Sequence, residues 1–168
     1  MEKAYPKENR IHSSEQKPFS YYECAIPNRF GCVPMHWHSE FELNFIREGS
    51  AEFICGEEKF ISQKGDIIIT QPNVLHSIYP CPNVSQRYDT LVFSREIFGG
   101  LEQDRYISEC IKPLVNSTMK IPTRITSEHC YYNEIEMMTE NIFACARGDE
   151  PRLDMLMRSE LIRLFWLL

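Results

Sequence analysis

Two histidines separated by one residue, with a glutamate shortly after them, constrain this chain more than any other feature. His36, His38 and Glu42 precede Gly49, which ends the segment. Residues two apart on an extended strand point to the same face, so the imidazoles of His36 and His38, ~6.6 Å apart along the strand, can reach one ion or ligand. Glu42 lies ~13 Å from His38 along a straight strand, and it reaches the same place only if the chain bends at residues 39–40.

A second stretch supplies another histidine. Gly65 and Asp66 predict a turn, residues 67–70 form a β-branched run typical of a buried strand, and Pro72 predicts a turn before His76. Three imidazoles and one carboxylate are good ligands for Zn, Ni, Fe or Mn. The same groups can instead form hydrogen bonds in a pocket for an organic molecule. Both hypotheses follow from the sequence.

The two stretches resemble the paired motifs of the cupin superfamily. These motifs read H-x-H, three residues, Glu, six residues, Gly, and then Gly-Asp, a β run, a proline turn and a histidine. Asn73 stands where many cupins have glycine, and asparagine tolerates the left-handed turn conformation. Residues 19–168 are also similar to the N-terminal effector domain of AraC/XylS-type transcriptional regulators, through the order of HWHSEFELNFIREGSAEF, GDIIITQP, YDTLVFSREIF and two helical segments.

This resemblance implies a mainly β fold with C-terminal α structure, in which a cupin-like double-stranded β-helix (jelly-roll) barrel precedes a helical hairpin. Many short strands with frequent turn signals independently favour a sandwich or barrel. We expect a flexible N-terminal arm over residues 1–18, the barrel over 19–97, a connecting segment over 98–125 and the hairpin over 126–168.

The hairpin is predicted from helical spacing of apolar residues. Thr126 or Ser127 is the expected N-cap of its first helix, and Asp149 is the expected cap of the second. The apolar stripe of the second helix can pack on the rest of the chain, or, as the resemblance implies, on a second copy. The candidate dimer contacts are Leu153, Leu156, Leu161, Leu164 and Phe165.

Composition limits the partners of the chain. The net charge of −6 argues against a nucleic-acid surface within these residues. The last helix ends without a C-cap or polar tail, so we expect a further domain beyond residue 168, outside this chain. The resemblance implies that it is a DNA-binding helix-turn-helix domain. The sequence contains no run of eighteen apolar residues and no signal-peptide core, which predicts a cytoplasmic protein without a membrane partner.

The resemblance implies a ligand-sensing and dimerisation domain of a bacterial AraC-type regulator, which binds a small-molecule effector in its barrel, forms a homodimer and requires no cofactor. The candidate pocket residues are Tyr22, His36, His38, Glu42, Asn44, His76 and Tyr88. The candidate ligands of a divalent metal (Zn, Ni, Fe or Mn) are His36, His38, Glu42 and His76. An alternative hypothesis is a metal-dependent cupin enzyme of the dioxygenase or isomerase type that uses these four residues. His12 and His129 match no motif and are expected at the surface.

Overall fold

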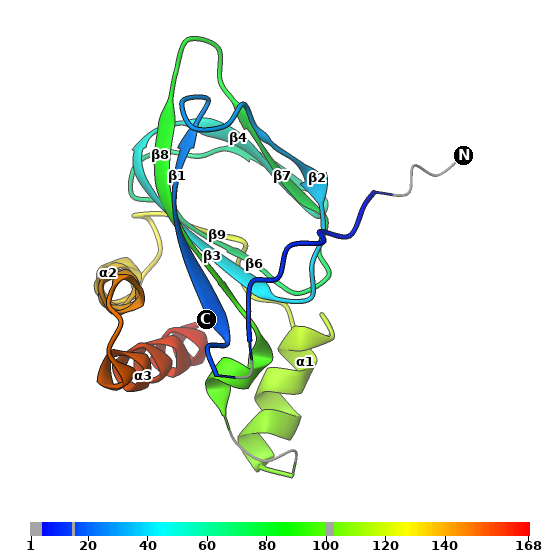
Figure 1. Ribbon diagram of the computed structural model, residues 1–168, viewed down its shortest axis with the longest axis vertical. Coiled ribbons are helices and arrows are strands. Elements are labelled where there is room, and N and C mark those ends of the chain that lie inside the picture. The colour runs from blue at the N-terminus through cyan, green and yellow to red at the C-terminus, as the bar shows by residue number, and fades with distance from the viewer. Residues whose placement is uncertain (1–4, 15, 100–102) are drawn as a thin grey trace.

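The short strands form two antiparallel sheets that face each other (Figure 1). The computed structural model describes residues 5–14, 16–99 and 103–168. One sheet has the order β1-β8-β3-β6-β9 and contains β1 (Phe19–Ile26), β8 (Gln86–Phe93), β3 (Phe41–Gly49), β6 (Ile67–Thr70) and β9 (Arg124–Ile125). The other has the order β2-β7-β4-β5 and contains β2 (Val33–His36), β7 (His76–Pro80), β4 (Ala51–Cys55) and β5 (Glu58–Ile61). Together they form the double-stranded β-helix of a cupin barrel.

Strand β3 lies between two cores. Its alternating residues Phe41, Leu43 and Phe45 face outward and join the core beneath the helices, whereas Ile46 joins the apolar cluster between the two sheets. Glu42 and Asn44, on the same face as Ile46, are also buried. Neither face of residues 41–46 is therefore exposed to solvent.

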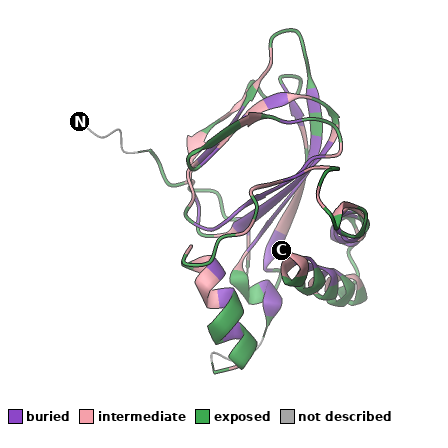
Figure 2. Cartoon of the chain, turned by 180° about the vertical axis from the view of Figure 1, so that it is seen from behind, coloured by how far each residue is buried: buried purple, intermediate pink, exposed green. Residues whose placement is uncertain are grey.

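Two helices follow the barrel and pack on each other, α2 (Tyr132–Arg147) and α3 (Pro151–Leu167). They cover the outer face of the five-stranded sheet, and Figure 2 shows buried residues along the barrel strands and exposed residues on the outward sides of the helices. Short helical segments connect the barrel to them, namely η1 (Arg95–Phe98), η2 (Ile107–Ile111) and α1 (Lys112–Val115). Among the described residues, no helix is both long and apolar enough to cross a bilayer.

The predicted start of the first helix at Thr126 or Ser127 is wrong. Residues 127–131 form turns, and α2 begins at Tyr132. The Tyr132 hydroxyl donates a hydrogen bond of 2.7 Å to the carbonyl of Gly65, which fixes the first turn of α2 against the barrel. A tertiary contact therefore sets this helix boundary in place of the local capping signal.

The predicted cap at Asp149 is also wrong. Glu150 is the N-cap of α3 and makes no side-chain capping bond, while Pro151 occupies the first turn. Proline suits this position because it lacks the N–H that a cap would satisfy and its φ is already helical. The segment predicted as a connection, residues 98–125, contributes β9, which pairs Ile125 with Ile67 at the edge of the sheet.

Two tight turns explain individual motif residues. Gly49 has φ +75°, and a Cβ at this position would lie 1.7 Å from the carbonyl oxygen of Ser85, so only glycine fits. Asn73 has φ +64°, which confirms that asparagine accommodates the left-handed turn where many cupins have glycine.

The apolar stripe of α3 faces the chain's own barrel. Leu161 and Leu164 have 0% exposure. Phe165 packs edge-to-face on Phe41, with ring centroids 5.2 Å apart. Leu153 is half-buried and Leu156 is exposed. Of the five candidate dimer contacts, Leu161 and Leu164 are therefore not accessible to a second copy in this conformation.

We predict that Leu161→Ala lowers the free energy of unfolding by about 2–5 kcal/mol, because it leaves a cavity in a packed core. The exposed Met137 of α2 is the matched control, and Met137→Ala should cost well under 1 kcal/mol, about the ±0.5 kcal/mol typical of surface changes. Urea denaturation at low and high protein concentration measures both. Equal, small losses in the two variants would contradict the packing of α3 on the barrel.

Candidate functional site

Four polar side chains from three strands and one bend meet at one end of the barrel. His36 of β2 and His76 of β7 are register partners, and their ring centroids are 4.2 Å apart. His38 follows β2, and its ring centroid lies 4.9 Å from that of His76. The chain bends at residues 39–40, as predicted, and returns as β3 with Glu42 beside these rings.

Backbone carbonyls fix the three rings and their tautomers. The Nδ1 atom of each imidazole lies within hydrogen-bond distance of a main-chain carbonyl. The distances are 2.8 Å from His36 to Pro34, 3.2 Å from His38 to Glu40 and 2.9 Å from His76 to Val74. Because a carbonyl oxygen only accepts, each Nδ1 must carry a proton and donate. In the neutral rings, each Nε2 then presents a lone pair, which is the arrangement that metal-binding histidines use.

Glu42 places negative charge among these nitrogens. Its Oε2 lies 3.4 Å from Nε2 of His38 and 3.6 Å from Nε2 of His76. Its Oε1 accepts a 2.8 Å hydrogen bond from Asn44, and the Asn44 carbonyl oxygen accepts one of 2.6 Å from Thr90. Burial alone would raise the pKa of Glu42, but the contacts with His38 and His76 together outweigh it and hold the pKa well below its usual range.

This arrangement fits a metal ion. One nitrogen from each of His36, His38 and His76 lies within 4.8 Å of the other two. Nε2 of His76 is buried and lies 3.6 Å from Oε2 of Glu42, and it has no partner within hydrogen-bond distance among the described residues. A ring of inward-facing lone pairs is stabilised by a cation or by protons. The buried triad can therefore hold a divalent metal, with Glu42 adjacent to it.

The N-terminal arm reaches the same site. Glu8 Oε2 lies 3.3 Å from Nε2 of His36 and 3.1 Å from Nε2 of His12. Hydrogen bonds to His12 and then His36 hold the pKa of Glu8 below its usual range. Burial would lower the pKa of His36, but Glu8 and the carbonyl of Pro34 raise it overall. The arm thus brings an anion to the open side of the triad.

The expectation that His12 lies at the surface is wrong, because this residue is only 5% exposed. Its Nδ1 lies 3.0 Å from the hydroxyl of Tyr22, and its main-chain carbonyl accepts a 2.6 Å hydrogen bond from Ser20. A bridge between Lys7 and Trp37, with a 2.9 Å bond from the N–H of Glu8 to the carbonyl of Trp37, anchors the arm further. His129 is partly exposed in the turns before α2.

A cavity of about 290 Å³ lies beside the triad, inside the barrel. Of the candidate pocket residues, four line it, namely Tyr22, His36, Glu42 and Tyr88. The other three lie behind this lining, with Asn44 bonded to Glu42 and the rings of His38 and His76 packed around its carboxylate. The arm contributes Glu8, Arg10 and His12 to the lining, and the Arg10 guanidinium lies 4.4 Å from the ring centroid of Tyr22. Sequence analysis missed these three residues, because the arm has neither strand periodicity nor a motif.

The two facing sheets, with an H-x-H pair, a glutamate and a third histidine at one end, define a small cupin barrel with a metal-compatible, ligand-sized cavity. The family model of the AraC-like ligand binding domain matches residues 20–163. The chain belongs to the AraC-like ligand binding domain family.

One curated relative is named as a transcriptional regulator. The uncharacterized HTH-type transcriptional regulator YdeC of Bacillus subtilis (strain 168) is 31% identical over 107 residues, which are 58% of this chain and 36% of that protein. The chain therefore spans about a third of the length of this relative.

Two solved structures are also similar. A cupin family protein of Methanocaldococcus jannaschii with a double-stranded β-helix fold is 14% identical, over 45% of this chain and 70% of that chain, with a TM-score of 0.41. A protein from Photorhabdus luminescens is 25% identical, over 47% of this chain and 65% of that chain, also with a TM-score of 0.41. These scores are low, and the fold assignment rests on the strand order and register given above.

We predict that Zn²⁺, Ni²⁺, Fe²⁺ or Mn²⁺ raises the melting temperature of the native chain and that His76→Ala abolishes this rise. A metal at a hundredfold excess over its Kd would add about 2.7 kcal/mol of stability. His129→Ala removes a histidine outside the triad and should leave the rise intact.

Metal binding should weaken as pH falls, because protons compete for the same nitrogens. Elemental analysis of protein prepared without an affinity tag measures the metal content. A rise that persists in His76→Ala, or none in the native chain, would contradict metal binding by the triad.

Proposed function

We propose that this chain is the sensing part of an AraC-type transcription regulator of the cytoplasm and that its effector is a small molecule bound in the barrel cavity. The single observation that carries this proposal is the cavity of about 290 Å³, which both the barrel and the arm line. Its lining combines aromatic and aliphatic side chains with imidazoles, carboxylates and one guanidinium, which suits a small ligand with an apolar body and a polar group. Family membership and the regulator relative support the same function.

DNA contact belongs, in this proposal, to a helix-turn-helix domain beyond residue 168. The relative named as an HTH-type regulator is much longer than the matched region, and the chain carries a net charge of −6. An acidic domain gains little from phosphate contacts, which dominate DNA affinity. The sensing domain would act on DNA binding by favouring one conformation or assembly when the effector is bound.

A metal-dependent cupin enzyme is a second candidate, because the histidine triad can hold a metal. Such an enzyme needs an open coordination position for its substrate. Here the arm carboxylate of Glu8 lies 3.3 Å from Nε2 of His36, on the side of the cavity. This contact, together with the family match, favours a sensor in which any metal helps to bind the effector.

We predict that filling the cavity removes effector binding. Val33 lines the cavity, and Val33→Phe adds a ring to it. Val84 is 40% exposed in a loop away from the cavity, so Val84→Phe is the matched control. In a thermal-shift screen of small metabolites, compounds that stabilise the native chain and Val84→Phe should not stabilise Val33→Phe. Compounds that stabilise all three proteins equally would show that the effector binds elsewhere.

We also propose that the domain forms a homodimer through the outward face of α3. Met155, Ile162 and Trp166 are 72%, 43% and 81% exposed, respectively. They are seven and four residues apart, which places them on one stripe of the helix opposite the buried leucines. A large exposed indole beside two aliphatic side chains is typical of an interface core.

Light scattering tests this assembly. We predict a dimer for the native chain and a monomer for Ile162→Glu, because a carboxylate in an apolar contact is costly to desolvate. The exposed Met137 of α2 is the control, and Met137→Glu should remain dimeric. All three proteins should melt at similar temperatures when compared as monomers at low concentration. Retention of the dimer in Ile162→Glu would exclude this face as the interface.

A further inference from the structure

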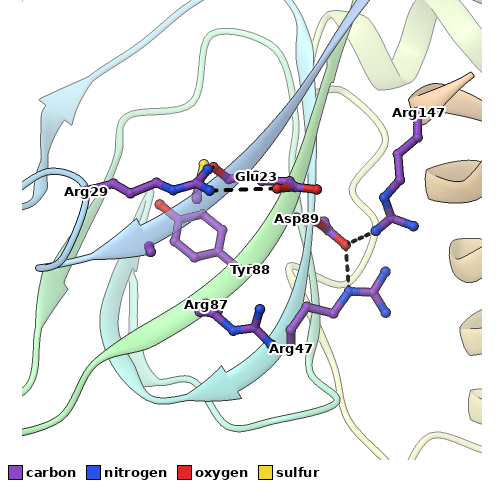
Figure 3. Close-up of a pocket in the computed structure, with 9 residues that line it drawn as sticks. Glu23, Arg29, Arg47, Arg87, Tyr88, Asp89 and Arg147 are labelled. Carbon is purple, nitrogen blue, oxygen red and sulfur yellow. Dashed lines mark hydrogen bonds and ion pairs between the residues drawn. The ribbon is translucent and has the colours of Figure 1, made fainter. Parts of the chain in front are cut away.

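A second cavity, of about 280 Å³, lies at the outer face of the β1–β8 ladder, where α2 ends (Figure 3). Its charged lining residues are Glu23, Arg29, Arg47, Arg87, Asp89 and Arg147. Along β8, Arg87 and Asp89 belong to one face of the sheet, whereas Thr90 faces the barrel cavity. The two cavities are neighbours across the β1–β8 ladder, and Glu23, Cys24 and Tyr88 line both of them.

Asp89 holds two arginine side chains of this second cavity in place. Its carboxylate is 7% exposed and accepts hydrogen bonds of 2.6 Å from Arg47, 2.6 Å from Arg147 and 2.7 Å from the hydroxyl of Tyr21. One carboxylate thus holds two guanidiniums from different elements, β3 and the last residue of α2. These bonds pre-organise both guanidiniums at the cavity wall without filling their hydrogen-bonding capacity.

Unused donors remain on this wall. Arg47 donates through Nε to Asp89 and through Nη1 to Glu140, and Arg147 donates through Nε to Tyr21 and through Nη2 to Asp89. Within residues 5–14, 16–99 and 103–168, no hydrogen bond involves Nη2 of Arg47 or Nη1 of Arg147. A planar guanidinium with free N–H groups is the group that proteins use for carboxylate and phosphate.

The opposite rim supplies two more guanidiniums, which are held only weakly. Arg29 is 60% exposed, donates a 2.7 Å hydrogen bond to the main-chain carbonyl of Glu23 and lies 3.8 Å from the Glu23 carboxylate. Arg87 pairs with Glu48 at 2.9 Å, and both side chains are 61% exposed. The Arg87–Glu48 contact has a second hydrogen bond of 3.1 Å from Nε, but both pairs are exposed to solvent, which screens them and lets a ligand compete for the guanidiniums. The lining carries four cationic and two anionic side chains, while Glu48 and Glu140 pair with Arg87 and Arg47 from outside it.

We propose that this cavity binds a small organic anion through a phosphate or carboxylate group, which lies between Arg29 and Arg87 of the rim and Arg47 and Arg147 of the wall. The site adjoins the barrel cavity, but its four arginines do not line that cavity, and the proposal does not depend on the function proposed for the barrel. Because Arg147 ends α2 and the other three arginines belong to the barrel, the bound anion joins the helical hairpin to the β1–β8 edge of the sheet.

Isothermal titration with inorganic phosphate and with succinate, at constant ionic strength set by NaCl, tests the site. We expect saturable binding of one anion per chain for at least one probe. Arg29→Ala with Arg87→Ala should weaken it by about tenfold or more, through the loss of two charge-assisted contacts. These two side chains lie outside the Asp89 network, so the variant should keep the native melting temperature without ligand. Arg29→Gln alone serves if the double variant does not fold.

Two matched proteins complete the design. Arg105→Ala with Arg152→Ala removes the same charge from side chains that are 87% and 89% exposed and outside the cavity, and should bind as the native chain does. His76→Ala should also bind normally, which separates this site from a metal in the barrel. Binding of phosphate alone or of succinate alone would support the site and identify the anionic group. The proposal is overturned if neither probe binds saturably, if both double variants weaken binding equally, or if His76→Ala removes it.

Discussion

The alternation of side chains along β3 and β8 is the constraint on which the rest of the structure depends. Both strands have neighbours on each side in the five-stranded sheet. The side chains on one face of each strand must therefore fit the barrel interior, and those on the other face must pack beneath the helices. Phe41 and Phe93 stack toward the helices, while Glu42 and Thr90 face inward. A shift of one residue in β3 would bury Phe41 in the polar site and place Glu42 beneath α3, which makes this register costly to change.

Buried carboxylates recur in this domain, and each is surrounded by cationic or donor groups, most of them from other elements. Glu42 lies among imidazoles and accepts from Asn44, while Asp89 accepts from two guanidiniums and a phenol. Asp66, 6% exposed, pairs with Arg124 of β9 at 2.8 Å. Removing one partner from such a group leaves a desolvated charge, which costs far more than the pair itself contributes. The polar positions of this barrel therefore tolerate substitution less well than its surface.

The barrel and the histidine site could be predicted from the sequence because their determinants are local. Spacing of two, a bend at residues 39–40 and a turn before His76 suffice to bring the ligands together once the strands pair. The contribution of the arm could not be predicted, because Glu8 acts through a contact with His36 that no periodicity encodes. The second cavity could not be predicted for the same reason. Arg29 and Arg147 are far apart in the sequence and line one cavity only because α2 packs on the sheet. The start of α2 likewise follows from the contact between Tyr132 and Gly65.

The carbonyl contacts of the three histidines also have an entropic consequence. In an unconstrained site, each imidazole would lose rotational freedom when a ligand or ion arrives, at about 0.5–1.5 kcal/mol per side chain. Here the main-chain carbonyls of Pro34, Glu40 and Val74 already restrict these rings in the free domain. The loss of rotational entropy therefore occurs when the chain folds and not when a ligand binds. Whatever binds at this end of the barrel meets rigid partners, and its affinity reflects its own ordering and desolvation far more than the ordering of the protein.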